Sequence, residues 1–132
     1  MKPFSSKWSA RLVSGVLGGA AIAFVDNCAF EGEASPILVI ALLFAATAAS
    51  GAIWGRSAWM TVAVIWACVP LAHVVKHFFG LPDTLHPNTY TSILLLAAFT
   101  FAVAAVGTAC GMLIRRPAMG PARLHETPQR PA

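Results

Sequence analysis

The chain has 132 residues, of which 58% are hydrophobic and only 11% are charged. A soluble domain usually carries about a quarter charged residues, and the mean hydropathy of +0.72 also argues against an ordinary soluble fold. The net charge of +4 does not indicate a nucleic-acid-binding surface, because the basic residues flank long apolar runs instead of covering one face. The composition therefore predicts an integral membrane protein built as one domain.

Four apolar runs follow one another along the chain, each near the roughly 20 residues that a helix needs to cross a bilayer. They cover approximately residues 12–30, 36–54, 58–79 and 90–114. Because the connections are short, we expect sequential helices to be antiparallel neighbours. The sequence thus predicts an all-α integral membrane protein, a four-transmembrane-helix antiparallel bundle over residues 1–116. The remaining residues, 117–132, contain four prolines and little that could pack, and we expect a disordered cytoplasmic tail.

The first apolar run has a second interpretation. Basic residues precede it, and its Ala21-Ile-Ala23 segment resembles the cleavage site of a secretory signal peptide. Cleavage after Ala23 would leave three helices and an N-terminus outside the cell. The apolar run continues beyond this point through Phe24, which favours a first helix that is retained.

The basic residues predict the orientation of the helices. With a cytoplasmic N-terminus, eight of the nine fall on the cytoplasmic side, as the positive-inside rule requires. These eight are Lys2, Lys7, Arg11, Arg56, Arg115, Arg116, Arg123 and Arg130. Only Lys76 lies near the outer face. We therefore expect a multi-pass protein of a bacterial inner (plasma) membrane with both termini in the cytoplasm.

Three GxxxG patterns predict where helices approach closely. They are Gly15–Gly19, Gly51–Gly55 and Gly107–Gly111, each toward the cytoplasmic end of its own helix. Small residues let helix backbones come together in lipid, where apolar burial gives little drive for association. The patterns are consistent with packing inside one chain or with a face that binds a second copy.

The ionisable residues of the spans gather near the outer ends of the first and third helices. Asp26, His73, Lys76 and His77 are candidates for an ion pair or a proton path, because a charge within a span needs a partner and often marks function. We expect Asp26 to pair with Lys76, with His73 or His77 as the second choice. Outer-loop residues add Glu31, Glu33, Asp83 and His86 to the same side.

Three interpretations of this cluster stay open. In the first, the side chains simply face headgroups and water. In the second, they titrate along a proton or ion path. In the third, His73 and His77 bind a metal from one helix face. The metal interpretation is weak, since Lys76 between the two imidazoles would repel a cation. We expect no cofactor. The odd set of three cysteines, Cys28, Cys68 and Cys110, does not form a disulfide framework.

No nucleophile, phosphate-binding or paired-carboxylate motif supports an enzyme. We expect a noncatalytic accessory or structural component of a membrane assembly, surrounded by lipid, with itself or another membrane protein as partner. The alternative is a small homo-oligomeric transporter or channel for an ion or small solute that uses the outer cluster. The chain resembles small multidrug-resistance transporters in length and helix number only, because their first helix carries a carboxylate deep in the membrane and this one has Asp26 near its end.

Overall fold

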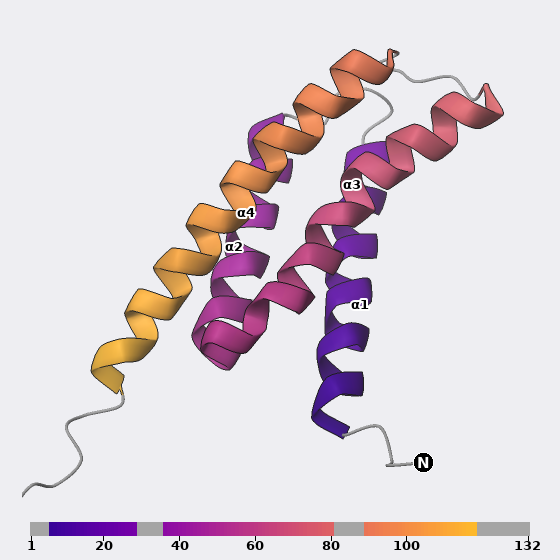
Figure 1. The fold of residues 1–132 in the computed structure, drawn as a ribbon. Coiled ribbons are helices and arrows are strands. Elements are labelled where there is room, and N and C mark those ends of the chain that lie inside the picture. Colours follow the sequence, from indigo (N-terminus) through magenta and orange to yellow (C-terminus); the bar gives the residue numbers. More distant parts are fainter. Residues whose placement is uncertain (1–5, 29–35, 81–88, 119–132) are drawn as a thin grey trace, which may run out of the picture.

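A computed structural model describes residues 6–28, 36–80 and 89–118, and all of its regular structure in these ranges is helical (Figure 1). The helices are α1 (Ser6–Cys28), α2 (Pro36–Trp54), the 3₁₀-helix η1 (Gly55–Ala58), α3 (Trp59–Phe79) and α4 (Tyr90–Ala118). The prediction of an all-α protein is thereby confirmed for the described residues. Residues 117 and 118 of the predicted tail form the end of α4, and the remainder of the predicted tail lies outside the described residues.

Three stretches are long and apolar enough to cross a membrane: Lys7–Asp26, Pro36–Phe79 and Tyr90–Arg115. The middle stretch has 44 residues and contains α2, η1 and α3. The chain reverses direction within it, because α2 and α3 meet at η1 and run in opposite directions (Figure 1). The apolar runs predicted from the sequence therefore coincide with helices, although α1 begins earlier than expected, at Ser6.

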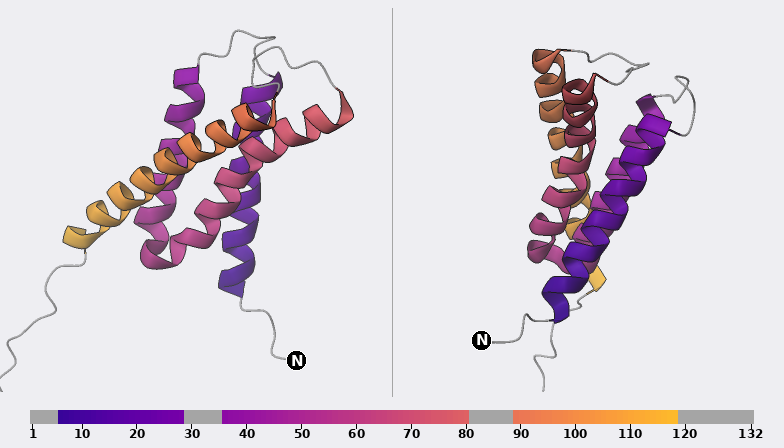
Figure 2. Two further views of the ribbon diagram at one scale, coloured as in Figure 1. Left: turned by 45° about the horizontal axis from the view of Figure 1, so that its top comes forward. Right: turned by 90° about the vertical axis from the view of Figure 1, so that its right-hand side faces the viewer.

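The helices pack as two pairs that are not sequential. The tightest contacts join α1 to α3 and α2 to α4, while α3 also packs against α4. Followed by colour from the N-terminus, the helices alternate in direction, so each tight pair is parallel (Figures 1 and 2). Sequential helices are antiparallel and in contact, as expected, but they are not the tightest pairs (Figure 1). Short connections constrain the ends of helices, whereas the glycine faces described below decide which helices approach closely.

Two glycines with positive φ lie directly after α2 and after α3. Gly55 (φ +56°) starts the turn after α2, and Gly80 (φ +63°) ends α3 in a left-handed conformation. The Gly80 N–H donates to the carbonyl of His77 at 3.3 Å, as in other helix ends of this type. A side chain at either position would be strained, so both turns depend on glycine.

The core lies where the two pairs meet and is formed by aliphatic side chains. Its buried members are Ile22, Val39, Leu43, Ala58, Val62, Ile65, Val69 and Ala104. A polar contact also joins the pairs, since the Trp66 indole N–H donates to the carbonyl of Ala97 at 2.9 Å. The Trp66 ring also meets Phe101 edge-on at 5.3 Å between centroids, an arrangement favoured by aromatic quadrupoles. These contacts hold α3 against α4.

Candidate functional site

An ion pair joins the end of α1 to α3. The His73 Nε2 and the Asp26 Oδ2 are 2.9 Å apart, and their side chains are only 6% and 18% exposed. With the carboxylate ionised, the imidazole N–H is the donor. His73 follows Ile65 and Val69 at steps of four along α3, so it continues the buried face of that helix. Asp26 likewise follows the buried residues Gly19 and Ile22 along α1.

The sequence named His73 as a second choice of partner for Asp26, after Lys76. The structure brings His73 into contact with Asp26. Lys76 lies three positions further along α3 and lines a groove between α1 and α3. Residues three positions apart lie next to each other on a helix surface, and here His73 is buried while Lys76 is half-buried.

His73 and His77 engage different helices. The His77 ring packs edge-on against Tyr90 at the start of α4, with 4.6 Å between ring centroids, while His73 points to α1. Within residues 6–28, 36–80 and 89–118, no three His, Cys, Asp or Glu side chains lie close enough to hold a metal. The outer-loop candidates Glu31, Glu33, Asp83 and His86 lie outside these ranges.

The first glycine pattern lies at the crossing of α1 and α3. A Cβ on Gly19 would lie 2.6 Å from the Cys68 Sγ and 3.1 Å from the Cα of Ile65. One on Gly15 would lie 3.1 Å from the carbonyl oxygen of Thr61. The Thr61 hydroxyl completes this contact by donating to the Arg11 carbonyl at 3.3 Å. The two backbones are close because neither glycine has a side chain.

The other two glycine patterns face each other across α2 and α4. A Cβ on Gly111 would overlap the carbonyl oxygen of Ala48, and one on Gly51 would overlap that of Thr108. The third contact, at Gly107, is with Thr47. Here backbone meets backbone, so a larger residue would have to move a whole helix. Gly55 instead lies against the guanidinium of Arg115, which donates to the carbonyl of Ile53 at 2.9 Å.

Four of the buried hydroxyl groups bond the backbone of their own helices, whereas that of Thr61 donates to Arg11 in α1. Thr47, Thr100 and Thr108 each donate to the carbonyl four residues earlier, at 2.8, 2.8 and 2.7 Å. Ser50 does the same toward Ala46 at 2.9 Å. Hydroxyls that bond their own backbone offer little to a passing ion or solute. Polar side chains that the sequence offers in the helices below the outer cluster include Thr47, Ser50, Thr61, Thr100 and Thr108, and each of these hydroxyls donates to a backbone carbonyl.

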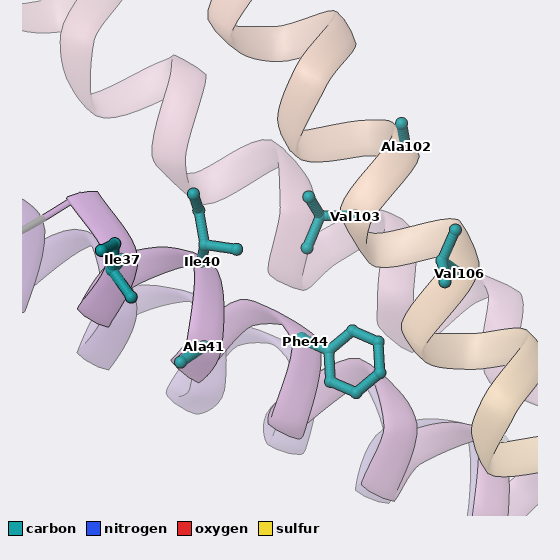
Figure 3. A pocket seen from close by; sticks show the side chains of 7 residues that line it. All are labelled: Ile37, Ile40, Ala41, Phe44, Ala102, Val103 and Val106. Atoms are coloured by element: carbon teal, nitrogen blue, oxygen red, sulfur yellow. The ribbon is translucent and has the colours of Figure 1, made fainter.

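Two grooves run along the outside of the helix pairs. The groove between α2 and α4 has a volume of about 520 Å³ and is lined only by apolar side chains, among them Ile40, Phe44 and Val103 (Figure 3). The groove between α1 and α3 has a volume of about 470 Å³ and is also apolar, except that Lys76 lines it. The ionisable side chains of the described interface, Asp26, His73 and Lys76, thus lie between or beside α1 and α3.

Comparisons with protein-family models, with curated proteins and with solved structures find no significant match to this chain.

Proposed function

We propose that the chain is a noncatalytic accessory or structural component of a membrane assembly, crossing the membrane four times with both termini in the cytoplasm. The observation that carries this proposal is the occupied interior of the bundle. Its buried hydroxyls all donate to backbone carbonyls, four within their own helices and Thr61 across to α1, and its core is aliphatic. A transport path would need polar groups that are available to a solute through the depth of the membrane.

The aromatic and basic residues support this orientation. Trp8, Trp54 and Trp59 lie at the start of α1, the end of α2 and the start of α3, which are the ends that the positive-inside rule assigns to the cytoplasm. Arg56 lies in the turn between α2 and α3 and is exposed. Tryptophan beside exposed arginine is typical of a membrane interface. The Asp26–His73 pair then lies toward the outer face.

Cysteine labelling in whole cells tests the orientation. Single cysteines at positions 33, 56 and 83 would be introduced into a variant in which the native cysteines are replaced by serine or alanine. A membrane-impermeant maleimide should label positions 33 and 83 in intact cells and position 56 only after permeabilisation. Labelling of position 56 in intact cells would refute the four-span arrangement, and the intact mass of the purified chain would reveal cleavage after Ala23.

Flux measurements test the noncatalytic, non-transporting role. The purified chain would be reconstituted into liposomes with a pH-sensitive dye inside, and a proton or potassium gradient would be applied. We expect the same leak as in liposomes that lack the protein. A flux that rises with the amount of protein and disappears in Asp26→Asn would refute the accessory role.

One observation favours the alternative of a small homo-oligomeric transporter or channel. A carboxylate and an imidazole in contact at 2.9 Å, largely shielded from solvent, form a group that can take up and release a proton. In that case Asp26 and His73 would be the proton-binding residues, and several copies of the chain would have to supply the remainder of the path. The Asp26→Asn arm of the flux experiment distinguishes this alternative directly.

A further inference from the structure

The groove between α1 and α3 has an apolar lining and one basic residue, Lys76. Ala23 and Phe24 line it from α1, and Cys68, Ala72 and Lys76 line it from α3. The ends of α1 and α3 that carry Cys28 and Phe79 lie apart in both figures, whereas the glycine contacts hold the helices together further down (Figures 1 and 2). The groove therefore extends along the helix pair from the glycine contact at Cys68 toward Lys76, near the end where the helices separate.

The length of this groove matches one leaflet of a bilayer. Cys68 and Lys76 are eight positions apart in α3, which corresponds to roughly 12 Å at 1.5 Å per residue. Half of the hydrocarbon core is about 15 Å thick. A transmembrane helix from another protein would need a groove about twice as long, whereas one acyl chain needs the depth of one leaflet. Lys76 would then lie close to the level of the phosphates, with its aliphatic stem along the apolar wall.

The charges at this end favour an anionic headgroup. Among the described residues, the other ionisable groups here are Asp26 and His73, which bond each other, and His77, whose ring packs on Tyr90. The Lys76 ammonium carries three N–H donors and can serve a phosphate oxygen in addition to another acceptor. The groove thus carries a positive charge at one end and an apolar lining below it, which matches the charged headgroup and the apolar acyl chain of an anionic phospholipid.

We propose that the groove between α1 and α3 is a binding site for an anionic phospholipid, with one acyl chain between Phe24 and Ala72 and the phosphate at Lys76. This inference rests on the membrane placement of the helices and is independent of whether the chain is an accessory component or a transporter. The groove between α2 and α4 is similar in volume, but its lining contains no charged residue. It serves as an internal comparison.

Native mass spectrometry of the full chain tests the proposal. The protein, purified in a mild detergent, would be mixed with equal amounts of phosphatidylglycerol and phosphatidylcholine, and the lipids retained per chain would be counted. We expect one phosphatidylglycerol to be retained, with at least a five-fold preference over phosphatidylcholine. Lys76→Glu should remove that preference, and Lys76→Arg should keep it because the cation remains.

Two further variants test whether lipid retention depends on the apolar groove as well as on the charge of Lys76. Ala72→Phe should fill the groove between α1 and α3 and reduce retention of both lipids several-fold. The matched change Ala102→Phe, in the groove between α2 and α4, should leave retention unchanged. Melting temperatures of all variants would show which of them are folded, and the Lys76 variants alone decide the outcome if Ala72→Phe does not fold. Equal retention of the two lipids, unchanged retention in Lys76→Glu, or equal losses in Ala72→Phe and Ala102→Phe would overturn the proposal.

Discussion

The two helix pairs use the same means of association but differ in chemistry. Both α1–α3 and α2–α4 approach through glycines, and both leave an apolar groove beside the contact. The contact between α1 and α3 also contains an ion pair, an interhelical hydroxyl bond and a lysine. The contact between α2 and α4 holds Thr47 and Thr108, whose hydroxyls bond their own helices, and it is closed at one end by Arg115. Packing alone therefore explains the α2–α4 pair, and the α1–α3 pair is where a function is to be sought.

The largest effect is expected at Gly111, in the α2–α4 pair. A single methyl group in Gly111→Ala would overlap the Ala48 backbone, so the helices must separate. We expect a loss of about 3 kcal/mol of stability, at the upper end of the usual cost of overpacking. The apparent melting temperature in detergent measures this, with Ala109→Leu on the exposed face of α4 as the control. If Gly111→Ala melts like the parent protein, α2 and α4 do not pack as described.

The second prediction concerns the ion pair in the α1–α3 contact. Asp26→Asn and His73→Gln should each lower stability by ~2 kcal/mol, because each leaves a shielded polar partner without its charge-assisted bond. The double variant should lose less than the sum, with a coupling of about 1–2 kcal/mol. The same cycle with Lys76→Met in place of His73→Gln should show a smaller coupling. Strictly additive losses for Asp26 and His73 would show that the two residues do not interact.

A third prediction compares Gly19 with Gly111. A methyl group at Gly19 would first meet the Cys68 Sγ, which can rotate away and leave the Cys68 Cβ at 2.9 Å, whereas Gly111 faces backbone. We expect Gly19→Ala to cost about 1–2 kcal/mol, less than Gly111→Ala. Adding Cys68→Ala should recover part of that loss, since the thiol no longer occupies the same space. No recovery in the double variant would mean that the nearby Ile65 backbone sets the limit.

Much of the fold could be predicted because each apolar run is close to the length of a membrane span. The glycine patterns also indicated which faces lie at contacts. The choice of partners could not be predicted, because periodicity shows which face of a helix is buried but not which helix covers it. For the same reason the preference for Lys76 over His73 as the partner of Asp26 could not be decided. The two positions differ by three residues, and only the crossing of α1 and α3 selects between them.

The contact of Arg115 with the end of α2 was likewise beyond sequence reasoning. In the sequence, Arg115 is one of eight basic residues that predict a cytoplasmic side. In the structure it also donates to the Ile53 carbonyl at 2.9 Å and packs on Gly55. This geometry depends on the left-handed turn at Gly55, which brings the last carbonyls of α2 beside α4. Helix C-termini attract cations, because their carbonyl groups lack partners within the helix.

Arg115→Gln gives the smallest expected effect and tests whether this end of the α2–α4 pair depends on that bond. We expect a loss of about 1 kcal/mol, because the bond involves a charged donor but lies in an exposed position. Arg56→Gln is the matched control, since it removes the same charge from an exposed residue of η1. A loss confined to Arg115→Gln would show that the guanidinium stabilises the pair by its contact with α2. Equal losses in both variants would instead assign the effect to net charge, and the α2–α4 pair would then rest on its glycines alone.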